Sequence, residues 1–306
     1  MPDQRSNQRP KRGGERSQLA LGLAFASPWI FGFLVFTAYP IVASLYYSFT
    51  YFDTLSPPVW VGAQNYTRLL TEDPLFWQSL RNTLFMVVFG LPASLVAGLA
   101  LALLLNQKLR GMAIYRTIFY IPSIVPTVAS SVLWMWLLNP QIGLINKMLA
   151  AAGVQGPGWL TDPAWSKPAL ILMGIWGVGS AMIIYLAGLQ DVSQELYEAA
   201  EIDGAGSAAK LFHVTLPMLS PVIFFNLVMG IIGTFQYFTQ VFVMTHGGPE
   251  DSTLFYALHL FNKAFVDLQF GYASAMAWIL FAITIAATAL VFRSSARWVY
   301  YPGETR

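Results

Sequence analysis

The chain has 306 residues and a formal net charge of +2, with 56% hydrophobic and only 10% charged residues. Soluble domains carry about 25% charged residues, so this composition predicts a membrane protein and does not indicate a nucleic-acid partner. The absence of cysteine excludes disulfides and thiolate metal sites, and the three histidines are too far apart to predict a metal site.

A basic segment precedes the first apolar run, which continues to about Ser48. Ala24-Phe25-Ala26 resembles a signal-peptide cleavage site, so a removed signal peptide is one alternative. However, only about seven residues separate Arg16 from this site, which is at the lower limit for the apolar region of a signal peptide. We therefore predict an uncleaved first span after a disordered cytoplasmic tail at residues 1–18.

Six apolar segments are long enough to cross a bilayer. Each predicts a helix, because a lone strand exposed to lipid cannot satisfy its backbone hydrogen bonds. No ionisable residue lies clearly inside the second to fifth segments, which argues against a proton-driven carrier. The six predicted spans are 19–47, 82–106, 114–138, 168–190, 218–245 and 272–293.

The distribution of basic residues predicts the orientation of these spans. Lys and Arg are more frequent on the segments that share a side with the N-terminus, and cytoplasmic loops carry this excess. Both termini, including the tail at 294–306, are therefore predicted to be cytoplasmic. The polar segment between the fourth and fifth spans then also faces the cytosol.

The third span contains Pro122 and Pro126 within the sequence YIPSIVPTVASS. Proline removes a backbone donor and kinks a helix, so two prolines four residues apart predict a bent or interrupted helix. Such breaks occur where a transporter opens a cavity. A passive kink relieved by the neighbouring serines is the alternative.

A polar segment, residues 191–217, separates the fourth and fifth spans and is rich in acidic residues. We predict a short helix at 194–203 with Ser193 as its N-cap, because serine oxygen accepts hydrogen bonds from the first turn. Gly204 permits a sharp turn. A second short helix is predicted from Ala205 to about Thr215, and Pro217 is predicted to begin the fifth span.

This segment matches the EAA motif of the permease subunits of binding-protein-dependent ABC importers. The resemblance extends from about residue 20 to residue 293 and is greatest to the carbohydrate-uptake branch, which includes maltose and glycerol-phosphate permeases. The motif residues, which the resemblance assigns to coupling with an ATPase, are Glu198, Ala199, Ala200, Asp203, Gly204, Ala205, Phe212, Leu216 and Pro217.

The resemblance implies an all-α polytopic membrane protein with the MetI-like permease fold. A six-helix transmembrane domain at 19–293 would carry a cytoplasmic coupling-helix loop at 191–217. The implied partners are a second homologous permease, two ATPase subunits and an extracytoplasmic solute-binding protein, in the cell membrane of a prokaryote. The chain itself would be neither an enzyme nor a cofactor-binding protein, since ATP and Mg would bind to the ATPase subunits.

Polar and aromatic residues in the middle of two spans predict a path for a sugar. Hydroxyl groups need hydrogen-bond partners, and the C–H faces of a sugar ring pack on aromatic surfaces. Polar groups at this depth are costly unless they face protein or a cavity, and hydrogen bonding between helices is the alternative reading. The candidates are Trp176, Gly177 and Ser180 in the fourth span and Gln236, Tyr237 and Gln240 in the fifth.

Other functions remain open on the sequence alone. A permease for a polyol or a glycerophosphodiester is one alternative, although a phosphate would favour a cation in the path and none is evident. A membrane-embedded enzyme would need clustered catalytic side chains, and a receptor would need no path. The chain has no phosphate-binding G-x-x-x-x-G-K-[ST] loop, so any ATP must bind to another chain.

Overall fold

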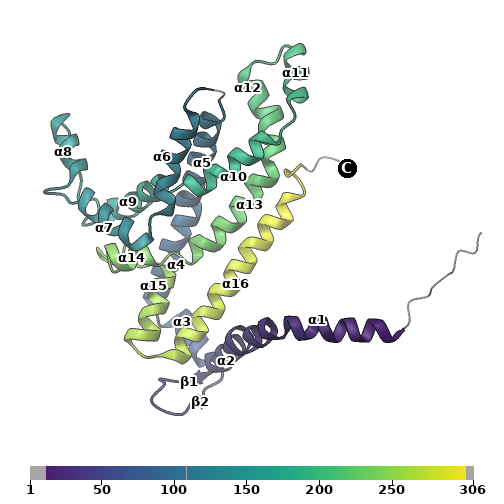
Figure 1. The fold of residues 1–306 in the computed structure, drawn as a ribbon. Helices are drawn as coiled ribbons and strands as arrows, with labels where there is room; N and C mark the ends of the chain where they lie inside the picture. Colours follow the sequence, from purple (N-terminus) through teal and green to yellow (C-terminus); the bar gives the residue numbers. More distant parts are fainter. Residues whose placement is uncertain (1–11, 108, 301–306) are drawn as a thin grey trace, which may run out of the picture.

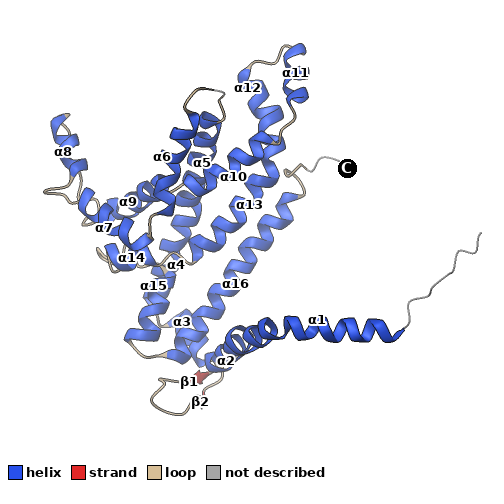
Figure 2. Ribbon diagram, viewed as in Figure 1, coloured by secondary structure: helices blue, strands red, loops and turns tan. Residues whose placement is uncertain are grey.

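The computed structural model describes residues 12–107 and 109–300 and is almost entirely helical (Figures 1 and 2). Residues 1–11 and 301–306 of the two predicted tails lie outside these ranges. Within the described ranges the only strands are β1 (Thr50–Tyr51) and β2 (Val59–Trp60), which pair antiparallel with Thr50 opposite Trp60.

The helices follow one another with short connections. The N-terminal half contains α1 (Arg12–Phe33), α2 (Tyr39–Ser48), α3 (Gln64–Thr71), α4 (Pro74–Phe85), α5 (Leu91–Leu105), α6 (Met112–Ile124), α7 (Thr127–Leu137) and α8 (Leu144–Ala151). The C-terminal half contains α9 (Pro163–Trp176), α10 (Gly179–Gln190), α11 (Gln194–Ile202), α12 (Ser207–Lys210), α13 (Leu216–Phe235), α14 (Thr239–Met244), α15 (Tyr256–Phe261) and α16 (Phe270–Ser295). Four π-helical turns, η1 (Leu34–Ala38), η2 (Met86–Gly90), η3 (Leu211–Thr215) and η4 (Asn262–Val266), join or extend them.

Four continuous helical segments are long and apolar enough to cross a membrane: Ala20–Ser48, Pro74–Leu105, Ser207–Met244 and Phe270–Ser295. Two further pairs of helices pass the same test together but are bent, α6 with α7 by 99° and α9 with α10 by 48°. Counting each bent pair as one crossing gives up to six spans. The predicted all-α membrane architecture is therefore confirmed, and the predicted break in the third span lies at Val125–Pro126.

The second span begins at Pro74 and not at residue 82 as predicted. Asp73 caps this helix, because its side-chain Oδ1 accepts hydrogen bonds from the backbone N–H groups of Leu75 and Phe76 at 3.0 and 3.2 Å. Proline is well tolerated at the first helical position. The polar first turns of the helix therefore belong to the span, although their composition resembles a loop.

This extension overturns one expectation about charge. Arg81 lies in α4 and Lys167 lies in α9, so the second and fourth spans each contain a basic residue that was predicted to lie in a loop. Both side chains are within the outer turns of their helices. Long basic side chains near the ends of a span can extend toward the polar interface.

Three prolines in the spans follow a π-helical turn by two residues: Pro40, Pro92 and Pro217. In each case the residue before the proline donates its N–H to the carbonyl five residues back, as in Tyr39 to Leu34. A proline ring clashes with the carbonyl four residues back, and the wider turn gives that carbonyl room. The helix continues through the proline, so Pro217 lies inside a continuous helix and does not begin the fifth span.

Two other prolines rely on a preceding serine. Ser220 Oγ donates to the carbonyl of Pro217 at 2.6 Å, and Pro221 would leave this same carbonyl without a donor. Ser27 Oγ donates to the carbonyl of Ala24 at 2.8 Å, four residues before Pro28. Unpaired carbonyls cost several kcal/mol in hydrocarbon, so these hydroxyls permit proline within a span.

The spans are arranged as a bundle from which α1 departs (Figure 1). The helix α2 packs along α16, α13 lies beside α16, and α5 packs along α10. At the end of the bundle that carries β1 and β2, Asp73 joins three elements: its Oδ2 accepts from Tyr272 Oη at 2.7 Å and lies 3.0 Å from His259 Nε2.

The pKa values of the two partners outside the spans follow from this geometry. Burial would raise the pKa of Asp73, but the hydrogen bonds of Tyr272 and His259 outweigh burial and lower it. Burial lowers the pKa of His259 more than Asp73 raises it, so the imidazole is neutral at pH 7. The contact is therefore a hydrogen bond from a neutral histidine to a carboxylate.

We predict that Gly179→Ala destabilises the contact between α10 and α6. A Cβ atom at this position would lie 2.6 Å from the carbonyl oxygen of Phe119 and 2.9 Å from Tyr120 Cα, so the backbone must move. The expected loss is about 1–3 kcal/mol of the free energy of unfolding, seen as a lower melting temperature of the purified protein. Gly233→Ala is the matched control, because no atom lies within 4 Å of its added Cβ. Equal melting temperatures for the two variants would contradict the prediction.

Candidate functional site

The polar segment between the fourth and fifth spans folds as expected at its start. Ser193 caps α11, since its Oγ accepts from Glu195 N at 3.3 Å. The helix ends at Ile202, and Gly204 follows with φ of +80°, a left-handed conformation that glycine adopts without steric cost. The predicted short helix and the predicted turn at Gly204 are therefore confirmed.

The second half of the segment differs from the prediction. The helix begins at Ser207 and not at Ala205, and it continues through η3 into α13 without a break. There is no separate second short helix, because the π-helical turn accommodates Pro217. The fifth span therefore extends as one helix into the segment that carries the EAA motif.

Two side-chain contacts hold α11 against this extension. Lys210 Nζ lies 2.6 Å from Glu201 Oε1, and Tyr197 Oη lies 3.0 Å from Thr215 Oγ1. Both contacts join α11 to the segment from α12 to η3. Together with the Gly204 turn they fix the angle between the two helices, so this polar segment is one rigid projection at the end of the bundle opposite β1 and β2 (Figure 1).

Several residues of this projection are exposed without a partner in the described chain. The carboxylate of Glu198 makes no hydrogen bond or ion pair with any described residue. Ile202 is 88% exposed and Phe212 is 64% exposed. Large apolar side chains exposed on a polar projection are typical of a surface that binds another protein. The nine EAA-motif residues lie on or beside this surface, and the α11 side of the motif is Glu198, Ala199 and Ala200.

A cavity lies where three spans are interrupted. The third span breaks at Val125–Pro126, the fourth at Gly177–Val178, and the fifth at Gln236–Phe238 between α13 and α14. Residues from all three breaks line one cavity of about 220 Å³. Its lining residues are Pro122, Ser123, Val125, Thr127, Ser130, Met173, Gly174, Trp176, Gly177, Tyr237 and Gln240.

The lining of this cavity is uncharged and mixed. It combines two aromatic residues, Trp176 and Tyr237, with side chains that can hydrogen-bond, including Ser123, Thr127 and Gln240. Within residues 12–107 and 109–300, the Tyr237 hydroxyl and the Gln240 amide have no hydrogen-bond partner. Polar groups at the depth of a helix break are costly without a partner, so this cavity suits a neutral polar solute.

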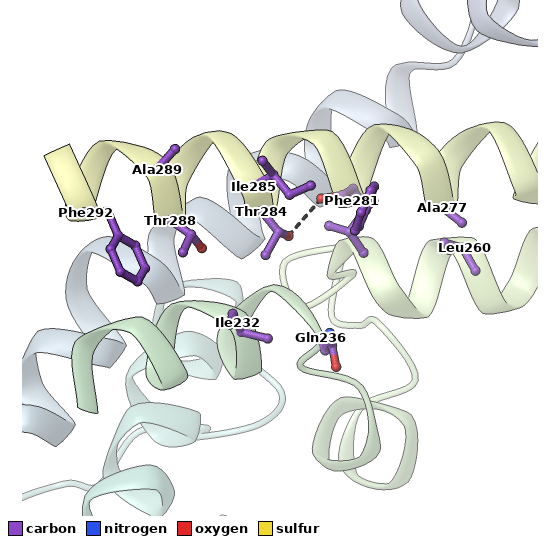
Figure 3. Close-up of a pocket in the computed structure, with 11 residues that line it drawn as sticks. Ile232, Gln236, Leu260, Ala277, Phe281, Thr284, Ile285, Thr288, Ala289 and Phe292 are labelled. Atoms are coloured by element: carbon purple, nitrogen blue, oxygen red, sulfur yellow. Dashed lines mark hydrogen bonds between the residues drawn. The ribbon is translucent and has the colours of Figure 1, made fainter. Parts of the chain in front are cut away.

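Four of the six predicted path residues meet here, namely Trp176, Gly177, Tyr237 and Gln240. Ser180 is exposed on α10 and does not line the cavity. Gln236 lines a different and larger cavity of about 680 Å³ between α13 and α16 (Figure 3). That cavity is mostly apolar, so the smaller cavity is the better candidate for a polar solute.

The sequence analysis missed three polar lining residues, Ser123, Thr127 and Ser130. They belong to the proline-containing segment of the third span, which was predicted to be bent. The signal was therefore present, since hydroxyl residues beside two prolines mark a break. What the sequence did not show is that this break faces the breaks of the fourth and fifth spans.

Comparisons with known proteins are consistent along the chain. Residues 70–300 match the family model described as the binding-protein-dependent transport system inner membrane component. The chain is 43% identical to the probable ABC transporter permease protein YesP of Bacillus subtilis, with 92% of this chain and 93% of that protein covered. It is 37% identical to the lactose transport system permease protein LacF of Rhizobium radiobacter, with coverage of 89% and 92%.

A solved structure has the same fold. It is a chain of the bacterial alginate ABC transporter in complex with an alginate pentasaccharide-bound periplasmic protein. The match has a TM-score of 0.80 and 23% identity, and it covers 93% of this chain and 96% of that chain.

We predict that cysteines placed around the cavity differ in reactivity according to the lining. The chain has no native cysteine, so single substitutions are unambiguous. Ser130→Cys is expected to react with a small water-soluble thiol reagent several times faster than Ser131→Cys. Ser130 lines the cavity, whereas Ser131 is fully buried next to it, and both hydroxyls donate to the carbonyl of Thr127. Mass spectrometry of the intact protein measures both rates, and equal rates would contradict the assignment.

Proposed function

Because the chain belongs to the family of binding-protein-dependent transport system inner membrane components, we propose that it forms the membrane path for a sugar or oligosaccharide. The chain is an ABC-importer permease in a prokaryotic cell membrane and is not itself an enzyme. The observation that supports a sugar most directly is the uncharged cavity at the three helix breaks. It offers hydroxyl and amide groups together with the aromatic rings of Trp176 and Tyr237.

The relatives support the same substrate class. Permeases whose names specify lactose, trehalose and maltose, diacetylchitobiose or arabino-oligosaccharides are 30–37% identical to this chain over 88–91% of its length. We therefore extend a carbohydrate substrate to this chain. A glycerophosphodiester is less well supported, because no cation among the described residues lines the cavity. A neutral polyol remains the second candidate, since it would make the same hydrogen bonds.

In this proposal the substrate contacts Trp176, Gly177, Tyr237 and Gln240 within the cavity. Ser180 and Gln236 would line the path beyond the cavity, on the faces of α10 and α13 that the described chain leaves exposed. A second permease would close those faces. The cavity alone is small for an oligosaccharide, so it would hold part of the substrate at a time.

The proposed assembly has four kinds of component. A second homologous permease completes the path, two ATPase subunits bind ATP and Mg²⁺, and an extracytoplasmic binding protein delivers the sugar. The projection with Glu198 would face the cytosol and dock to an ATPase, which places both termini in the cytosol. The excess of basic residues on that side supports this orientation.

The proposal is tested by reconstitution of the complete complex in proteoliposomes. We expect the sugar-loaded binding protein to stimulate both ATP hydrolysis and uptake, and we expect this chain without the second permease to transport nothing. A panel of neutral sugars, uronate-containing sugars and polyols identifies the class. Sugar transport by this chain alone, or the absence of transport for every sugar, would overturn the proposal.

We predict that Glu198→Lys weakens binding of the ATPase. The residue projects from α11 without a partner in the described chain, so its contribution must come from another protein. Reversal of the charge removes a charge-assisted hydrogen bond and introduces an unpaired cation at an interface, which is expected to lower the affinity about tenfold or more. Co-purification of the ATPase measures the effect. Asp191→Lys is the control, because it makes the same charge change outside α11. Equal ATPase yields for the two variants would return Glu198 to an ordinary exposed position.

A further inference from the structure

The loop after the fifth span is held between the second and fourth spans by buried hydrogen bonds. Asn82 Nδ2 donates to the carbonyls of Asp251 and Leu254 at 2.8 and 3.0 Å. The backbone N–H of Tyr256 donates to Thr83 Oγ1 at 2.9 Å. These bonds fix the backbone immediately before and after Phe255. We call Asn82, Thr83 and Lys167 the loop clamp.

Lys167 completes the loop clamp from the fourth span. Its Nζ donates to Asn82 Oδ1 at 3.0 Å and to the carbonyl of Ser252 at 3.2 Å, and it lies 5.3 Å from the centre of the Phe85 ring. Lys167 forms no ion pair with any described carboxylate. A cation held only by an amide and a carbonyl is costly to place near hydrocarbon, so a purely stabilising role does not explain it well.

The clamped residue is in contact with the cavity. Phe255 is 1% exposed and packs edge-on against Tyr237, with the ring centres 5.6 Å apart. Tyr237 lies in the non-helical break of the fifth span, so no helical hydrogen bond of its own fixes its orientation beyond the turn to Thr234. The position of its ring therefore depends on Phe255, and the position of Phe255 depends on the loop clamp.

We propose that Lys167 and Asn82 are positioning residues for transport, because they hold Phe255 in the place that orients Tyr237 in the cavity. This inference rests on the proposed function only in its transport readout. The geometric part, that loss of Lys167 changes the cavity, holds for any solute. Neither residue lines the cavity, so both act through the loop.

The test uses the complete complex with Lys167→Met, which keeps the length of the side chain and removes its ammonium. Asn82 Oδ1 and the carbonyl of Ser252 then lose a donor. We expect assembly and stimulated ATP hydrolysis to persist, while the amount of sugar transported per ATP falls roughly tenfold. Lys167→Arg retains a donor for both acceptors and is expected to restore most of the transport. Lys147→Met, which removes an exposed cation on α8, is the matched control and is expected to behave as the wild type.

A second readout needs no sugar. Gln240→Cys on α14 reports the shape of the cavity through its rate of reaction with a thiol reagent. We expect this rate to change several-fold in the Lys167→Met background and to recover with Lys167→Arg. If Lys167→Met does not assemble, Phe255→Leu replaces it, since this variant keeps the loop clamp and removes only the aromatic contact with Tyr237.

The outcomes separate the two proposals. Unchanged labelling of Gln240→Cys in Lys167→Met or Phe255→Leu would overturn the positioning role, as would transport losses that only parallel lost assembly. If the wild-type complex transports no sugar but the labelling changes as expected, the proposed substrate fails and the positioning role stands.

Discussion

The need to pair every backbone N–H and C=O group in hydrocarbon determines most of this structure. Where a proline interrupts a span without a polar cavity beside it, the chain repairs the helix, either with a π-helical turn as before Pro92 or with a serine hydroxyl as before Pro221. Where the helix is left broken, at Val125, Gly177 and Gln236, the breaks face one another. Unpaired backbone is tolerated in a membrane only where it is buried in protein or lines a water-filled space. The cavity at these breaks is therefore the place where the fold permits polar contact with a solute.

The sequence was sufficient to predict the helical membrane architecture, the short helix α11 and the turn at Gly204. These features depend on local signals: long apolar runs, a serine before an acidic first turn, and a glycine at a left-handed position. The start of the second span was not predicted, because the Asp73–Pro74 cap lies before polar residues that resemble a loop. The continuity of α12 with α13 was missed for a similar reason, since proline ordinarily marks the start of a helix and the compensating π-helical turn has no clear signature in the sequence.

The cavity was only partly predictable because it depends on which breaks face each other. Gln236 and Tyr237 are adjacent in the sequence and have similar depth, yet Gln236 lines the cavity between α13 and α16 and Tyr237 lines the one at the breaks. Helical periodicity stops at Gln236, so it could not assign their directions. Ser123 and Thr127 reach the same cavity through the 99° bend between α6 and α7, and that angle is set by tertiary packing. The close approach of Gly179 to the backbone of Phe119 is part of that packing.

The continuous helix from Ser207 to Phe235 joins the two sites that the sequence suggested separately. It spans roughly 40 Å at 1.5 Å per residue, and it begins in the projection with the EAA motif and ends at the break beside Tyr237. Close packing with α10 at Gly188, where an added Cβ would lie within 3 Å of Leu219 and Val222, keeps the two spans that carry the projection together. A tilt of the projection is therefore carried along a stiff helix to the break, whereas two separate helices would have absorbed it at a hinge. On the opposite side of that break, Phe255 is fixed to the second and fourth spans, so a displacement of α13 changes the position of Tyr237 relative to an anchored neighbour.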